Sequence, residues 1–169
     1  MSSNKIPKLR IGDLEVDVPI IQGGMGVGIS LSGLAAAVAN EGGIGVISSA
    51  AIGMLEADFE RNFKEANRRA LHREIKRAKE MTKGIIGVNV MVALSDYDEL
   101  LRVAVAEGTD LVFLGAGLPL KVPELWPPGE WEKVTTKIVP IVSSSRITSA
   151  SYKSTSKYVI SPSRTSKIY

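Results

Sequence analysis

Short apolar runs alternate with stretches of helical periodicity along most of the chain. After a predicted hairpin over residues 9–18, β-like runs lie at residues 19–22, 44–47, 85–92, 110–114 and 136–143. The run at 44–47 is apolar throughout, as expected of a strand that is covered on both faces in a parallel sheet. The pattern predicts an α/β fold of parallel βα units, built either as a doubly wound sheet or as the opening part of a TIM barrel.

Turn and capping residues mark where the predicted helices begin and end. In the first helix, Ser30 or Ser32 can serve as the N-cap, and Gly42 can take the left-handed conformation after the last turn. The second helix is predicted over about residues 56–83, with acidic residues at its start and basic residues at its end, as the helix dipole favours. A third helix, over residues 95–107, opens with a sequence that resembles a capping box.

Length and composition narrow the class of protein. The 169 residues suit one domain, and 44% hydrophobic with 23% charged residues is the balance of a soluble globular protein. With no cysteine and a single histidine, His72, which we interpret as solvated surface, we predict no metal site. No apolar stretch reaches the roughly 18 residues of a membrane span, and no signal-peptide core follows the amino terminus. We therefore expect a cytoplasmic protein with no membrane partner.

The net charge of +3 comes from the carboxyl-terminal segment. Residues 133–169 contain seven Lys or Arg and no Asp or Glu, whereas residues 1–132 carry a net charge of −4. The basic pI therefore does not indicate a nucleic-acid partner. Residues 145–169 hold eight Ser, three Thr and five Lys or Arg without an amphipathic period. We interpret residues 1–144 as one domain and residues 145–169 as a low-complexity tail, either a disordered basic extension or the product of a slipped reading frame.

A glycine cluster follows the first predicted strand of the α/β region. Half of the 16 glycines lie between Gly23 and Gly45, and glycines let a backbone approach a ligand closely. The cluster does not match the G-x-G-x-x-G dinucleotide fingerprint, because the third glycine would fall on Leu31 or Ile29. No P-loop sequence occurs either. The cluster by itself therefore predicts either a structural tight turn or a ligand contact.

Asn89 lies inside a β-branched run, where asparagine is disfavoured. It is on the opposite side of the strand from Val88 and Val90, and a buried amide needs hydrogen-bond partners. One interpretation is an internal hydrogen bond. The other places Asn89 at the carboxyl end of a barrel strand, where ligand-binding side chains gather.

The quoted motifs resemble those of a known enzyme family. The sequence Pro-Ile-Ile-Gln-Gly-Gly-Met-Gly-Val-Gly at 19–28, the run Leu-Ala-Ala-Ala-Val-Ala-Asn-Glu-Gly-Gly-Ile-Gly-Val-Ile at 34–47 and Gly-Val-Asn-Val-Met at 87–91 are similar to the nitronate monooxygenase family, also called 2-nitropropane dioxygenases. The resemblance covers about residues 9–144. It implies an FMN-dependent TIM-barrel oxidoreductase. The family also includes the FMN-type enoyl-acyl-carrier-protein reductases.

The resemblance also implies roles for individual residues. The backbone of Gly23, Gly24 and Met25 and the Met25 side chain would face the flavin ring, and Asn89 would hydrogen-bond to it. The implied reaction oxidises an alkyl nitronate with O₂ to a carbonyl compound and nitrite. No catalytic residue is assigned, because the family's catalytic histidine motif and its later phosphate-binding glycine loops have no counterpart in the sequence. We expect a barrel truncated after the fifth strand, with weak or absent flavin binding and negligible turnover.

Other functions and partners remain open at this point. An FMN-type enoyl reductase acting on an enoyl thioester is the alternative enzyme, and an inactive fragment of a disrupted gene is a non-enzymatic one. Open edge strands expose groups that pair with other strands. They lead us to expect self-association, in which two half-barrels complete one ring.

Overall fold

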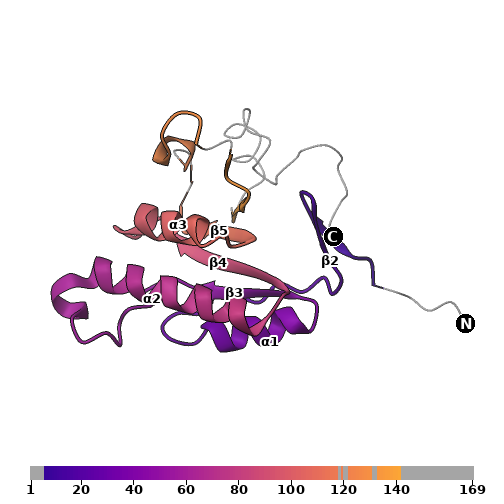
Figure 1. Cartoon of the computed structure of the whole chain (residues 1–169), viewed down its shortest axis with the longest axis horizontal. Helices are drawn as coiled ribbons and strands as arrows, with labels where there is room; N and C mark the ends of the chain where they lie inside the picture. Colours follow the sequence, from indigo (N-terminus) through magenta and orange to yellow (C-terminus); the bar gives the residue numbers. More distant parts are fainter. Residues whose placement is uncertain (1–5, 118, 120–121, 131–132, 142–169) are drawn as a thin grey trace, which may run out of the picture.

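The computed structural model describes residues 6–117, 119, 122–130 and 133–141, and in it helices line one side of a parallel sheet (Figure 1). The predicted tail and residues 142–144 lie outside these ranges. An antiparallel hairpin precedes the sheet, as predicted. The elements are β1 (Leu9–Ile11), β2 (Leu14–Val16), α1 (Ser32–Asn40), β3 (Ile44–Ser48), α2 (Phe59–Met81), β4 (Ile85–Met91), α3 (Tyr97–Ala106), β5 (Leu111–Gly115), a 3₁₀ turn (Val122–Leu125) and β6 (Lys137–Pro140).

The strand order distinguishes between the two predicted architectures. The strands β3, β4, β5 and β6 lie side by side in the order of the sequence, and every neighbouring pair is parallel. A doubly wound sheet reverses its order at the first strand, whereas a TIM barrel adds each new strand beside the previous one. The order therefore supports the barrel architecture.

The predicted strand at residues 19–22 is present only as a single bridge, so its predicted extent was wrong. Ile21 pairs in parallel with Ile44. The Gln22 N–H donates to Ile44 O at 3.0 Å, and the Ile44 N–H donates to Ile20 O at 2.9 Å. The proline that opens this segment has no N–H to offer, and the glycines that follow turn the chain away from the sheet. The segment nevertheless lies beside β3, where the first strand of a barrel belongs.

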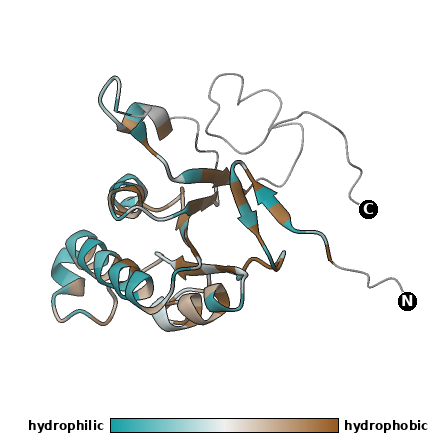
Figure 2. Cartoon of the chain, turned by 45° about the vertical axis from the view of Figure 1, so that its right-hand side comes forward, coloured by the Kyte–Doolittle hydropathy of each residue, from teal (hydrophilic) through white to brown (hydrophobic). Residues whose placement is uncertain are grey.

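The two faces of the sheet are covered by different elements. Figure 2 shows the helices on one side of the sheet and the β1–β2 hairpin on the other. The helix side, here called the outer face, buries one hydrophobic cluster that includes Ile47, Val88 and Leu114. On the inner face the hairpin closes a second cluster over the amino-terminal part of the strands, formed by the buried residues Ile11, Val16, Ile44, Val46, Leu111 and Phe113.

The first helix lies where it is predicted, but its amino end is capped differently. Leu31 occupies the N-cap position, and neither Ser30 nor Ser32 caps the helix with its side chain. Instead, the Ser32 N–H donates to a carboxylate oxygen of the buried Glu74, on α2, at 3.0 Å. A negative charge at a helix amino terminus is favourable, so Glu74 replaces the expected hydroxyl cap. Gly42 has φ +83, as predicted for the residue after the last turn.

The other two helices are shorter than predicted. The second begins at Phe59 and ends at Met81, with a kink at Asn62 where φ is −147° and ψ is 50°. The capping-box prediction for α3 was wrong, because Asp96 is the N-cap and makes no side-chain capping bond. The buried Asp96 carboxylate accepts a hydrogen bond from Asn67 Nδ2 at 2.8 Å, which ties α2 to the start of α3. None of the helices that the structure describes has the length and apolarity to cross a membrane.

Candidate cofactor-binding site

Residues 23–29, called the glycine loop from here on, lie against the carboxyl ends of β3 and β4. A Cβ atom at Gly24 would be 2.5 Å from the Cβ of Asn89, which no real side chain tolerates. A Cβ atom at Gly26 would be 3.5 Å from the Oγ of Ser48. The first contact requires a bare backbone at Gly24, whereas the second is an ordinary van der Waals distance. The structure thus brings Gly24 into direct contact with Asn89.

Three polar side chains at the ends of β3 and β4 have no hydrogen-bond partner among the residues that the structure describes. Ser48 and Asn89 are register partners on the inner face. The half-buried Asn89 amide makes no side-chain hydrogen bond with any residue that the structure describes, so the internal bond considered above is not found there. The Oγ atoms of Ser48 and Ser49 are buried and also unpartnered among those residues. Buried polar groups without partners are uncommon in native proteins, so these side chains are candidates for contacts with a ligand.

The glycine loop presents apolar side chains outward. Met25, Val27 and Ile29 are 45%, 46% and 57% exposed. These exposed apolar side chains lie beside the Asn89 amide and the backbone of Gly23 and Gly24. Small-molecule sites are lined in the same way, by apolar surface with a few polar groups.

The site contains no acid or base. No ionisable side chain occurs in residues 22–30, 48–50 or 89–91. These segments can bind and orient a ligand through backbone N–H groups, an amide and hydroxyls, but they hold no group that could carry a proton in the pH range of most enzymes. Within the described ranges there is also no cluster of three His, Asp or Glu side chains that could bind a metal ion.

Two residues that hold the glycine loop were not identified from the sequence. Ser30 is completely buried and hydrogen-bonds to both Gly23 and Met25. The Gln22 side chain hydrogen-bonds to Ser30 and to the backbone of Val46 in β3. The sequence signal was the polar Gln22 at the end of an apolar run, but its partners become visible only in the fold.

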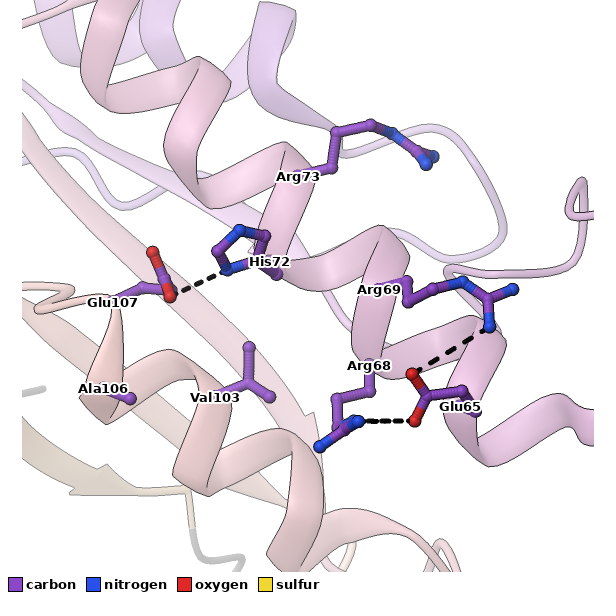
Figure 3. Close-up of a pocket in the computed structure, with 8 residues that line it drawn as sticks. All are labelled: Glu65, Arg68, Arg69, His72, Arg73, Val103, Ala106 and Glu107. Atoms are coloured by element: carbon purple, nitrogen blue, oxygen red, sulfur yellow. Dashed lines mark hydrogen bonds and ion pairs between the residues drawn. The ribbon is translucent and has the colours of Figure 1, made fainter.

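A cavity of about 490 Å³ lies on the outer surface between α2 and α3 (Figure 3), and none of its lining residues belongs to the glycine loop. His72 lines it and pairs with Glu107, with 2.8 Å between Nδ1 and Oε1. More than half of the His72 side chain is exposed, as the surface interpretation predicts. The arginines of the cavity are likewise paired with carboxylates, and the Asp58 carboxylate raises the pKa of Arg69 above its usual range. Because these charges are already neutralised, the cavity offers no free anion site.

The chain is similar to a known protein family and to solved structures of two enzymes. The family model described as nitronate monooxygenase matches residues 8–112. The structure of FabK from Thermotoga maritima is similar with a TM-score of 0.63 and 28% identity, over 81% of this chain and 39% of that chain. Nitroalkane oxidase from Streptomyces ansochromogenes shares the fold, with a TM-score of 0.57 and 20% identity over 74% of this chain and 40% of that chain. No curated protein sequence matches significantly. The chain thus spans about two fifths of the length of these neighbours, which are TIM-barrel enzymes.

Proposed function

Because the chain belongs to the nitronate monooxygenase family, we propose that Gly23, Gly24, Met25 and Asn89 bind the ring of FMN. We further propose that the protein is an oxidoreductase that converts alkyl nitronates and O₂ to carbonyl compounds and nitrite. The family and its structural neighbours are oxidoreductases, which supports the general class. The contacts with the flavin ring are proposed for the residues of this chain. The enzymatic activity is proposed for the whole protein, because the chain covers 39% of FabK.

The observation that carries the proposal is the contact between Gly24 and Asn89. It places an amide with no described partner beside a bare backbone and exposed apolar side chains. An amide can both donate and accept hydrogen bonds, and a flavin ring has both kinds of group along one edge. The residues present therefore fit the ring of a flavin.

The chain's own contribution is binding and orientation. When bound, FMN supplies the redox chemistry by taking electrons from the substrate, while the protein sets its position and surroundings. Asn89 would fix the edge of the ring, and Met25 would cover part of its apolar surface. None of the segments at the site holds a titratable group, so proton transfer is not assigned to any of these residues.

A second function has support of its own. The similarity to FabK, at 28% identity, exceeds the similarity to nitroalkane oxidase and favours an FMN-dependent enoyl-acyl-carrier-protein reductase. This enzyme would consume a reduced nicotinamide with an enoyl thioester. Oxygen uptake with an alkyl nitronate and nicotinamide oxidation with an enoyl thioester, assayed on the same protein, distinguish the two reactions.

The binding proposal is tested by titrating the purified chain with FMN and following the quenching of flavin fluorescence. We expect weak but saturable binding. Asn89→Ala keeps the Cβ that contacts Gly24 and removes only the amide, so the variant should fold normally. It should bind FMN about 3- to 10-fold more weakly, which corresponds to one lost hydrogen bond.

The matched control is Asn40→Ala, which removes an exposed asparagine at the end of α1. This variant should bind FMN like the wild type. Absence of saturable binding by the wild type, or equal affinity of Asn89→Ala and the wild type, would contradict the proposal.

A further inference from the structure

We propose that Gln22 and Ser30 are positioning residues that hold the glycine loop in the shape required for the cofactor. This inference rests on the proposed flavin site and concerns the residues behind it. The network of Gln22, Ser30 and their backbone partners is called the clasp below. It is built from hydrogen bonds that join both ends of the glycine loop to each other and to β3.

The Ser30 hydroxyl uses its full hydrogen-bonding capacity inside the clasp. It accepts from Gln22 Nε2 at 3.0 Å and from the Met25 N–H at 3.0 Å. Its proton is donated to Gly23 O at 3.1 Å, the one acceptor among these partners. A hydroxyl has one donor and two acceptor positions, so none is left for a ligand. Ser30 therefore acts on the site through the backbone it holds.

The main chain of Ser30 joins the same network. Its N–H donates to Met25 O at 3.0 Å, which makes a reciprocal pair with the bond from the Met25 N–H to the hydroxyl. Its carbonyl accepts from the Ser48 N–H at 2.9 Å, at the carboxyl end of β3. All polar groups of Ser30 are thus committed to fixing the glycine loop on the sheet.

Gln22 extends the sheet with its side chain. Its Nε2 donates to Val46 O at 2.9 Å, and its Oε1 accepts from the Val46 N–H at 3.3 Å. A side-chain amide has the same donor and acceptor as a peptide, so it continues the parallel ladder beyond the bridge at Ile21. The main chain is then free to leave the sheet and form the glycine loop.

The clasp determines where one backbone donor points. The Gly23 carbonyl is turned toward Ser30 by its hydrogen bond. In a trans peptide the C=O and the following N–H point in opposite directions, and the Gly23–Gly24 peptide is trans. The Gly24 N–H therefore points away from Ser30, and no described residue accepts a hydrogen bond from it. It is available to an acceptor on the ring beside Asn89.

Three variants test the inference. Ser30→Ala removes the centre of the clasp, and Gln22→Met removes the contact with Val46 while keeping a similar side-chain length. Thr136→Ala is the matched control, because its buried hydroxyl donates to Thr109 O at 2.7 Å near the amino end of β6. FMN affinity, the visible circular dichroism of bound flavin and amide hydrogen exchange of the apoprotein are measured for each.

We expect Ser30→Ala and Gln22→Met to bind FMN about tenfold more weakly, because binding must then also order the glycine loop. At saturation the visible circular dichroism should change, since it reports the orientation of the ring. Thr136→Ala should match the wild type in both measurements even if it unfolds more readily. Wild-type affinity and dichroism in both clasp variants would overturn the role of the clasp in the site.

Hydrogen exchange tests the clasp without a ligand. The Met25 amide should exchange at least about tenfold faster in Ser30→Ala than in the wild type and in Thr136→Ala, because its acceptor is gone. Unchanged Met25 exchange would overturn the clasp itself. If the wild-type chain failed to bind FMN, the proposed function would fail, and the exchange result would still decide whether the clasp holds the loop.

Discussion

Gly24→Ala is the substitution that tests the candidate site most directly, with Gly23→Ala as its matched control. The new Cβ at position 24 would be 2.5 Å from the Cβ and 2.9 Å from the Cγ of Asn89. At position 23 it would meet nothing within 4 Å, and the glycine has no positive φ. The two adjacent substitutions are chemically identical, so a difference between them reports the contact with Asn89.

The expected magnitude follows from the depth of the overlap. Carbon atoms pack at roughly 3.5–4.0 Å, so the Gly24→Ala contact is about 1 Å too short. Both atoms are close to the backbone, and a rotamer change cannot relieve the clash. Overpacking of this kind costs about 1–3 kcal/mol of unfolding free energy. Gly23→Ala should change the unfolding free energy by no more than about 0.5–1 kcal/mol, in the stabilising direction, because alanine restricts the unfolded chain.

Urea denaturation, followed by circular dichroism, measures both variants, and a double-mutant cycle locates the clash. Asn89→Gly removes the opposing Cβ, so adding Gly24→Ala in that background should cost much less than in the wild type. Gly24→Ala should also lower FMN affinity by more than Gly23→Ala does. Equal stability and equal affinity of the two single variants would refute the contact on which the site is built.

Three further substitutions test other parts of the structure. Gly33→Ala should stabilise the protein by roughly 0.5–1 kcal/mol in thermal unfolding, because this exposed position in α1 has free space around it and alanine favours the helix; destabilisation would contradict the helix assignment. Ser48→Ala should leave the apoprotein as stable as the wild type or up to about 1 kcal/mol more stable in urea denaturation, because the lost hydroxyl has no described partner; a clear loss would reveal a hidden one. The hydrogen bond from Lys137 lowers the pKa of Asp13, so this pair stabilises the fold above the ordinary Asp pKa and ceases to do so as the pH falls through the lowered value. Lys137→Met should raise the pKa of Asp13 toward its ordinary range in a carboxyl NMR titration, and an unchanged titration would argue against the pair.

The parallel βα organisation was predictable because it depends on local periodicity and on turn residues. The run at residues 44–47 and Gly42 lie in the structure as predicted. The strand at residues 19–22 was overestimated, because its apolar pattern says nothing about the glycines turning the chain away. In the same way, the family motifs implied that Gly24 and Asn89 serve one site, and the structure puts them in contact.

The supporting polar contacts could not be predicted, because they join residues far apart in the sequence. Glu74, on α2, hydrogen-bonds to the amino end of α1. The prediction of Ser30 or Ser32 as the N-cap was therefore wrong. Asp96 is engaged by Asn67 in place of a capping bond. Such pairings depend on how helices and strands pack against one another, which a local sequence motif does not reveal.

The β1–β2 hairpin separates the demands of stability from those of chemistry. It seals the amino-terminal half of the inner face with Ile11 and Val16, while the glycine loop occupies the opposite end of the same strands. If the glycine loop binds FMN as proposed, substitutions in it would alter the cofactor site and leave the packing under the hairpin intact. An engineer who wanted to alter the proposed cofactor site would redesign the glycine-loop end and leave the hairpin end untouched.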